Sequence, residues 1–311
     1  MKRDFLTLKD WSSDELKEMI QTAIRLKGEN RNNVRHHHLE GKKLAMIFEK
    51  PSTRTRVSFE VGMYELGGHP LNLSSHDIQL GRGETVKDTA RVLSRYVDGI
   101  MIRTKGHEII EELARYASVP VINGLTDDFH PCQVMADLQT IYEYRGNYNC
   151  KIAFIGDGNN MAQSWLFGAA KFGMDISVAS PEGYECKPKV VEEAKRIAES
   201  TGSKIELVRD PFDAVKGADF VYTDVWASMG QEAEKEARKV IFKDYQVNAA
   251  LMKATGKAAY FMHCLPAYMG LEVTTEVYEG PSSIVWDEAE NRLHAQKAIM
   301  LKVMGDRKFF E

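Results

Sequence analysis

The chain alternates between short apolar runs and longer segments in which apolar residues return every three or four positions. Short apolar runs are typical of buried strands, and the longer periodic segments are typical of amphipathic helices. The predicted strands have the sequences KLAMIFE, GIMIR, VPVINGL, KIAFIG, ISVAS, KIELV, DFVYTDVW, AAYFMHCL and SSIVWD. Strands that alternate with helices predict an α/β fold with doubly wound parallel sheets and right-handed crossovers.

The length of the chain predicts two domains. Its 311 residues exceed the size at which a single hydrophobic core usually stops growing. We expect residues 1–146 to form the first domain and residues 147–288 the second. The amphipathic segment over 289–311 is expected to pack back on the first domain and complete it.

A turn rich in hydroxyl groups follows the first predicted strand, at Ser52, Thr53, Arg54 and Thr55. Ser52 can cap the next helix, whose first amides have no partner within the helix and suit an anion. Arg54 adds a guanidinium group that matches two phosphate oxygens. The glycines and lysine of a nucleotide-binding loop are missing, so we expect a small phosphate compound. The alternative is an ordinary helix cap, with Arg56 paired to Glu60 one turn later.

Two further strand ends carry polar residues that suit a ligand. Arg103 ends the strand GIMIR, and the segment Phe129–Gln133, with the sequence FHPCQ, follows VPVINGL. Ligands of parallel α/β sheets bind at the carboxyl ends of the strands, so we expect both to converge with Ser52 on one site. A solvated cation is the alternative for Arg103.

The second half begins with a strand and a glycine turn that imitate a dinucleotide-binding loop. Gly156 and Gly158 match the first two glycines, but Met161 stands in the third position. The next strand ends on Ser180 instead of an acidic residue for the ribose. The sequence therefore predicts a tight turn without a nicotinamide cofactor. Residues 228–239 have too few apolar side chains for a core helix and are expected to form a charged loop or lid.

Composition narrows the choice of partner and compartment. A net charge of -4 and a pI near 6.2 argue against nucleic acid or an acidic membrane as the main partner. The start lacks the apolar core of a signal peptide, so a cytoplasmic protein is expected. Four cysteines without a Cys-x-x-Cys pair are expected to be reduced. The triplet His36–His38 has no sequence neighbours typical of metal sites, and we predict a solvated loop and no metal.

Four motifs, STRTR, HPCQ, DVWASMG and HCLP, together resemble the transcarbamoylase family, and within it the branch that uses ornithine. The resemblance covers nearly the whole chain. It implies two α/β domains linked by two helices, one for carbamoyl phosphate and one for L-ornithine, and a trimer or multiple of trimers with active sites between subunits. It also implies transfer of a carbamoyl group to the δ-amine of ornithine, which gives citrulline and phosphate without a cofactor.

The same resemblance implies roles for residues of the first domain and of the final helix. The phosphate is assigned to the Ser52–Thr55 turn and to Gln79, which reaches the site of a neighbouring subunit. The carbamoyl group is assigned to Arg103, His130, Gln133, Arg292 and the backbone carbonyl of Leu265. Arg103, His130 and Arg292 would direct donors at the oxyanion that forms when the carbonyl is attacked.

The ornithine contacts implied by the resemblance lie in the second domain. Asn160 would hold the α-carboxylate, Asp224 and Ser228 the α-ammonium, and Met229 contributes through its backbone. Cys264 would lie beside the attacking δ-nitrogen, where desolvation favours the neutral amine. Without the HCLP motif, a small buried apolar residue would be the preferred interpretation of Cys264.

One departure from the family and several rival functions remain at the level of the sequence. After HCLPA the family commonly continues with His or Arg, then Arg and Gly, whereas this chain has Tyr268, Met269 and Gly270. Ala267 and Gln79 disfavour aspartate as acceptor, because the aspartate branch carries cations there. Putrescine and N-acylated ornithine are the other possible acceptors, and an N-acylated α-amine would leave Asp224 without an ammonium group to pair with. A dinucleotide oxidoreductase and a non-catalytic anion-binding protein are the alternatives from other classes.

Overall fold

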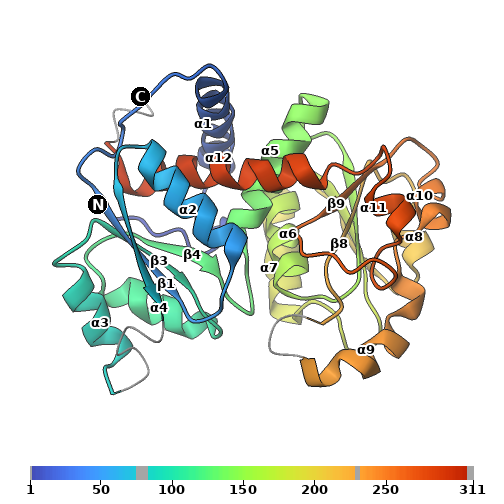
Figure 1. Cartoon of the computed structure of the whole chain (residues 1–311). Coiled ribbons are helices and arrows are strands. Elements are labelled where there is room, and N and C mark those ends of the chain that lie inside the picture. The colour runs from blue at the N-terminus through green and yellow to red at the C-terminus, as the bar shows by residue number, and fades with distance from the viewer. Residues whose placement is uncertain (1, 75–82, 228–231, 307–311) are drawn as a thin grey trace. The chain divides into compact units, whose positions relative to one another are not determined.

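The computed structural model describes residues 2–74, 83–227 and 232–306 (Figure 1). Gln79, Ser228 and Met229 lie outside the described residues. The chain divides into two compact units, Met1–Gln139 with Glu290–Glu311, and Thr140–Ala289. Each unit contains one parallel sheet with helices, which confirms the predicted fold class. The predicted domain boundaries at 146 and 288 stay a prediction.

The first unit is built on a four-stranded sheet with the order β2-β1-β3-β4. Its strands are β1 (Lys43–Phe48), β2 (His69–Ser74), β3 (Gly99–Arg103) and β4 (Val121–Leu125). Its helices are α1 (Ser13–Arg31), α2 (Thr53–Glu65), α3 (Val86–Leu93) and α4 (His107–Tyr116), preceded by the 3-10 turn Leu8–Asp10. Ser12 caps α1 through a reciprocal pair of hydrogen bonds with Glu15.

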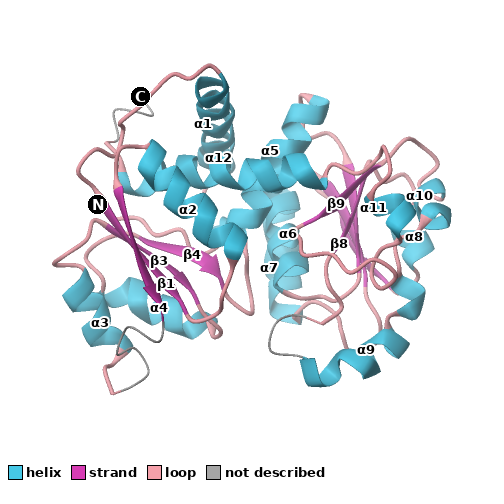
Figure 2. Cartoon of the chain, viewed as in Figure 1, coloured by secondary structure: helices cyan, strands magenta, loops and turns pink. Residues whose placement is uncertain are grey.

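Both faces of this sheet are covered, which explains the continuous apolar runs of its central strands. Ala45 and Ile47 of β1 pack with apolar residues of α3 and α4, including Ala90 and Ile110. The alternate positions of β1, among them Met46, are equally buried on the opposite face. Figure 2 shows α3 and α4 on one side of this sheet and α2 with α12 on the other.

The second unit is built on a five-stranded sheet with the order β7-β6-β5-β8-β9. Its strands are β5 (Lys151–Ile155), β6 (Asp175–Ala179), β7 (Ile205–Val208), β8 (Phe220–Thr223) and β9 (Tyr260–His263). Its helices are α6 (Asn160–Phe172), α7 (Pro188–Thr201), α8 (Pro211–Val215), α9 (Lys235–Ile241), α10 (Ala249–Lys253) and α11 (Thr275–Tyr278), with 3-10 turns at Glu232–Glu234 and Lys243–Tyr245. Ile155 and Phe261 face the α8 side, and Phe154 stacks on Tyr222 against Trp165 of α6 on the other side.

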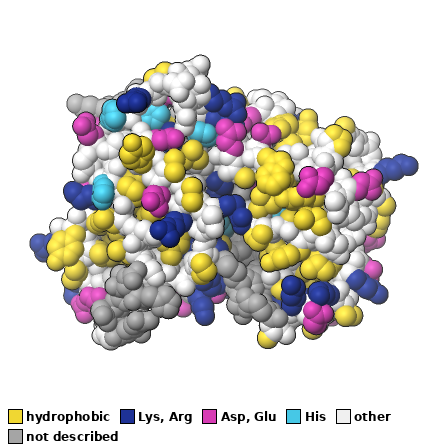
Figure 3. Space-filling model, viewed as in Figure 1, with side chains coloured by type: hydrophobic (Ala, Val, Ile, Leu, Met, Phe, Trp, Pro, Cys, Tyr) yellow, Lys and Arg dark blue, Asp and Glu magenta, His cyan; other side chains and the backbone are white. Residues whose placement is uncertain are grey.

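Two long helices pass from one unit to the other along the chain. These are α5 (Pro131–Arg145), which crosses the division after Gln139, and α12 (Val285–Met304), which crosses it before Glu290. Among the described residues no helix is long and apolar enough to cross a membrane. On the face drawn in Figure 3, basic and acidic side chains are interspersed.

Two local predictions are wrong. Only the second half of the predicted strand SSIVWD is helical, because α12 begins at Val285, and in the first half Ser283 forms an isolated bridge with Phe261. Asp287 and Glu288 stand in the first turn of α12, where acidic side chains stabilise a helix, and this outweighs the strand propensity of a short apolar run.

The predicted charged loop over 228–239 contains a helix instead, α9. Its Arg238 is buried and donates to Asp157 at 2.6 Å and to the carbonyl of Trp226 at 2.8 Å. Glu234, one turn earlier, accepts a further hydrogen bond from Arg238 at 2.9 Å. The helix is therefore anchored by a buried cation, which a search for an apolar face does not detect.

Candidate active site

In the first unit, three strand ends lie side by side. Phe48 of β1 pairs in register with Arg103 of β3, and Arg103 pairs with Leu125 of β4. The chain continues from β1 into α2 and from β4 toward α5. The structure thus brings the Ser52 turn, Arg103 and the start of α5 to the same edge of one sheet, where parallel sheets bind ligands.

The turn before α2 is arranged as an N-terminal cap. The hydroxyl of Ser52 accepts from the amide of Thr55 at 3.3 Å, which confirms the predicted cap. Thr55 is buried, whereas Thr53 is exposed and Arg54 is half-buried. Arg56 forms an exposed pair with Glu60 at 3.7 Å, as expected. Arg54 is thus placed at the positive end of a helix dipole.

Arg292 joins α12 to α2 and α5 within the first unit. Its Nη1 donates to Oε1 of Gln133 at 2.6 Å, and its Nη2 donates to the hydroxyl of Thr55 at 3.2 Å. The amide of Gln133 in turn donates to Asp137 at 2.8 Å. A buried guanidinium group therefore holds side chains from three helices in one network.

His130 is buried among arginines. Burial, and next the positive charges of Arg292, Arg103 and Arg54, hold the pKa of its imidazole well below the usual value. The ring is therefore neutral at physiological pH and can donate one hydrogen bond without adding charge. Three cations that converge around one neutral imidazole form a site suited to an anion with a polarised carbonyl group.

In the second unit, β5, β8 and β9 are neighbours, and their ends carry the other predicted residues. Ile155 pairs with Thr223, and Thr223 pairs with His263. Asp224 and Cys264 follow β8 and β9 directly. Asn160 is the first residue of α6, after β5, and its side chain is half-buried. The structure thus brings Asp224 and Cys264 together, and Asn160 starts the helix that follows the adjacent strand β5.

Asp224 is a buried carboxylate with fixed orientation. Its Oδ1 accepts from the thiol of Cys264 at 3.1 Å and from the amide of Val225 at 2.8 Å. Its Oδ2 accepts from the side-chain amide of Asn159 at 2.8 Å. Asn159 also caps α6 by accepting from the amide of Met161 at 2.9 Å. A rigid buried carboxylate is suited to a ligand that carries an ammonium group.

The loop after β9 is positioned by buried polar residues. The amide of Leu265 donates to Nδ1 of His263 at 2.9 Å, so Nε2 of that ring carries the proton toward Glu272, 3.3 Å away. Glu288 accepts from the amide of His263 at 3.0 Å. Leu265 has a φ of 59°, which non-glycine residues seldom adopt and which these contacts maintain.

Family models match both units. The carbamoyl-P binding domain of aspartate/ornithine carbamoyltransferase matches residues 3–143, and the Asp/Orn binding domain of the same family matches residues 148–303. The chain belongs to the aspartate/ornithine carbamoyltransferase family.

Individual members of the aspartate/ornithine carbamoyltransferase family are similar over nearly their full length. An ornithine carbamoyltransferase of Anoxybacillus flavithermus is 58% identical over 97% of this chain and 96% of its own length. The structure of ornithine carbamoyltransferase from Pyrococcus furiosus has a TM-score of 0.95 at 55% identity and covers 97% of both chains. The anabolic enzyme of Campylobacter jejuni has a TM-score of 0.92 at 46% identity, covering 97% of this chain and 99% of that one.

Sequence reasoning missed the residues that position this carbamoyltransferase site. Asn159 orients Asp224, and Glu272 with Glu288 holds the loop that carries Cys264. Asn159 could have been identified as the N-cap of α6, but its bond to Asp224 joins residues 65 positions apart. The unusual Tyr268 and Met269 are 46% and 47% exposed, and the amide of Tyr268 donates to Glu272 at 2.6 Å.

Proposed function

We propose that the chain transfers the carbamoyl group of carbamoyl phosphate to the δ-amine of L-ornithine, giving L-citrulline and phosphate. The observation that carries the proposal is the group of three arginines around a neutral His130 in the first unit. Carbamoyl phosphate combines an anionic phosphate with a carbonyl group. The phosphate requires cations, and the carbonyl oxygen requires a neutral or cationic donor.

In this proposal, the first unit binds carbamoyl phosphate. The phosphate lies at the start of α2, held by the amides and hydroxyls of Ser52, Thr53 and Thr55 and by the guanidinium of Arg54. Arg103 and His130 donate to the carbamoyl oxygen, together with Arg292. Gln133 contacts the carbamoyl amino group. Its Oε1 already accepts from Arg292 at 2.6 Å, which fixes the orientation of the amide.

The second unit binds ornithine. The carboxylate of Asp224 pairs with the α-ammonium, and Asn160 donates to the α-carboxylate. Cys264 contacts the δ-nitrogen. The hydrogen bond from its thiol to Asp224, 3.1 Å long, supports this placement because it fixes the sulfur next to the ammonium site. Ser228 and Met229 are proposed to add further contacts.

The reaction requires a neutral δ-amine and a stabilised oxyanion. An amine with a pKa of about 10.4 is neutral only about once in 10³ near pH 7, so the site must favour its deprotonation. The nitrogen lone pair attacks the carbamoyl carbon, and the carbonyl electrons move to oxygen, where Arg103, His130 and Arg292 donate. Collapse of this intermediate breaks the bond to phosphate, which leaves with its electron pair and takes the amine proton. No covalent bond to the protein forms.

A direct assay tests the proposed activity. Carbamoyl phosphate is supplied with ornithine, putrescine, N-acetylornithine or aspartate, and the carbamoylated product is measured in each case. We expect product with ornithine and at most traces with the others, because only ornithine provides an α-ammonium for Asp224, an α-carboxylate for Asn160 and a free δ-amine. Equal turnover of N-acetylornithine would contradict the role of Asp224, and equal turnover of putrescine would contradict the role of Asn160. The anabolic relatives support the synthetic direction.

We further propose a homotrimer, or a multiple of trimers, in the cytoplasm, with Gln79 acting in the site of a neighbouring subunit. Complementation tests this arrangement. Gln79→Ala and Arg54→Ala chains, each inactive alone, are denatured and reassembled together. A mixed trimer then contains sites in which both contributions are wild-type, so activity should rise above both parents without reaching the wild-type level. Mixed trimers without any gain would place Gln79 in its own subunit.

A further inference from the structure

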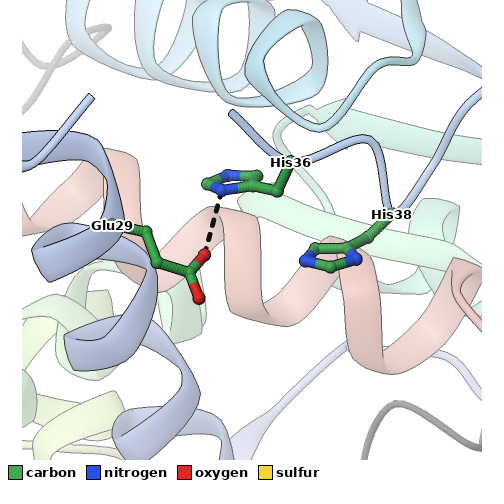
Figure 4. A group of neighbouring side chains, drawn as sticks. All are labelled: Glu29, His36 and His38. Carbon is green, nitrogen blue, oxygen red and sulfur yellow. Dashed lines mark ion pairs between the residues drawn. The ribbon is translucent and has the colours of Figure 1, made fainter. Parts of the chain in front are cut away.

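Glu29, His36 and His38 form a cluster that plays no part in the proposed reaction. Glu29 lies in the last turn of α1, and the two histidines lie in the connection between α1 and β1 (Figure 4). One potential ligand atom from each residue lies within 4.8 Å of the other two. His36 is only 8% exposed, whereas His38 is exposed. The prediction of a solvated loop is therefore wrong for His36.

The burial of His36 creates an unsatisfied group. Its Nδ1 lies 3.0 Å from Oε2 of Glu29, but among the described residues neither ring nitrogen has a hydrogen bond of good geometry. Oε2 of Glu29 is likewise buried without one. A buried polar group without a partner is destabilising, so native structures usually provide a partner or a bound ion.

We propose that Glu29, His36 and His38 bind a divalent transition-metal ion such as Zn²⁺. Two imidazole nitrogens and one carboxylate oxygen are a donor set that such ions prefer, with the remaining position open to water. Ligands of a tetrahedral zinc ion lie about 3.3 Å apart at bond lengths of about 2.0 Å. The 3.0 Å pair already meets this spacing, and the exposed His38 can close the remainder by side-chain rotation.

The surroundings suit a cation. Burial lowers the pKa values of His36 and His38, so both rings are neutral at physiological pH, as metal ligation requires. Glu29 stands at the negative end of the α1 dipole. Nε of Arg25 lies 3.9 Å from Oε1 of Glu29, whereas the other carboxylate oxygen, Oε2, lies next to Nδ1 of His36. The charge of nearby Lys297 is compensated by Glu65, 2.6 Å away.

The local backbone allows two histidines of the triplet to face the same ion. Successive residues would not share a face of a helix, but the connection between α1 and β1 is not helical at His36. In such a segment residues i and i+2 can point to the same side. The rings of His36 and His38 are nearly parallel, at 7°, with centroids 5.4 Å apart. The bound ion would link the end of α1 to this connection.

Zinc binding to the full chain tests the site. A second group, Asp224, His263 and Cys264, also has ligand atoms within 4.8 Å, so the titration is done in a Cys264→Ala background. We expect one Zn²⁺ per chain by calorimetry and a higher midpoint of thermal unfolding. Bound Co²⁺ should give visible absorption bands without sulfur charge transfer.

Single substitutions in that background identify the ligands. His38→Ala, Glu29→Gln and His36→Gln should each weaken Zn²⁺ binding by more than the roughly 10–100-fold lost when only a partner of a ligand is removed. His37→Ala is the matched control and should change affinity less than about twofold. Because His38 is exposed, His38→Ala should fold and tests the site even if a His36 variant fails to fold. Unchanged binding in His38→Ala, or equal loss in His37→Ala, would overturn the proposal.

Discussion

The two units use the same architecture for opposite electrostatic purposes. In each, neighbouring parallel strands end at one edge of a sheet and carry the candidate site residues there. In the first unit these ends provide Arg103 and the neutral His130, near Arg54 and Arg292. In the second unit they provide the buried carboxylate of Asp224. The fold thus fixes where a ligand binds, and a few side chains decide which charge it carries.

The largest effect is expected when the second unit loses its carboxylate. Asp224→Asn keeps the shape but removes the charge that we propose pairs with the ornithine ammonium. Loss of one partner of a buried ion pair costs about 3–5 kcal/mol, so kcat/KM for ornithine should fall at least about 100-fold. Steady-state kinetics measure this, with carbamoyl phosphate affinity unchanged. Asp213→Asn, an exposed carboxylate in the same unit, is the control. A similar loss in both variants would refute the assignment.

The matching change in the first unit is Arg54→Ala. A bidentate contact to phosphate contains two charge-assisted hydrogen bonds, so affinity for carbamoyl phosphate should fall by about 100-fold. The thermal midpoint should stay near the wild-type value, because Arg54 starts a helix and is not part of the core. Arg56→Ala, an exposed residue on the same helix, should bind normally. Unchanged affinity in folded Arg54→Ala would rule out the phosphate contact.

The second unit also contains a buried arginine, but its charge is already used within the protein. Arg238 pairs with Asp157 at 2.6 Å and lies 4.8 Å from the ring centroid of Tyr184. Arg238→Met should therefore lower stability by about 2–3 kcal/mol, as a mostly buried pair loses one partner. Denaturant unfolding measures the loss, and adding Asp157→Asn should recover part of it. A strictly additive double variant would show that the pair is not coupled.

The smallest effect concerns the pH dependence of the first unit. The folded pKa of His130 lies below its unfolded value of about 6.5. Between these values the unfolded chain binds a proton that the folded chain does not, so stability falls as pH decreases below about 6.5. The contribution is at most about 1.4 kcal/mol per pH unit. Unfolding of the wild type and of His130→Gln across this range should reveal a shallower slope in the variant.

Local patterns predicted most of the strands, because strands buried on both faces must be continuously apolar. They failed where distant residues decide the structure. The helix α9 lacks an apolar face, and its anchor Arg238 depends on Asp157, 81 positions earlier. The apolar run at Ile284 and Val285 has the composition of a strand, but it enters a helix whose first turn is acidic.

The candidate site shows the same contrast between local sequence patterns and contacts of distant residues. The strand-end argument indicated Ser52, Arg103 and His130, because the residues that follow parallel strands face ligands. Asp224 was implied by the family resemblance of the motif DVWASMG. These patterns gave no information about Asn159 or Glu272, which hold Asp224 and the loop of Cys264 through contacts made only in the folded chain. The grouping of His36 with Glu29 was equally hidden, since the carboxylate belongs to a preceding helix.

Because α5 and α12 lead from one unit to the other, the two units become complete at different times during synthesis of the chain. The second unit is a continuous segment, Thr140–Ala289, whereas the first unit requires Glu290–Glu311 in addition to its early residues. Until α12 leaves the ribosome, Glu65 lacks the ion pair with Lys297, and Thr55 and Gln133 lack Arg292. Domains fold as units when their residues become available. The half of the protein that is translated first is therefore the half that is completed last.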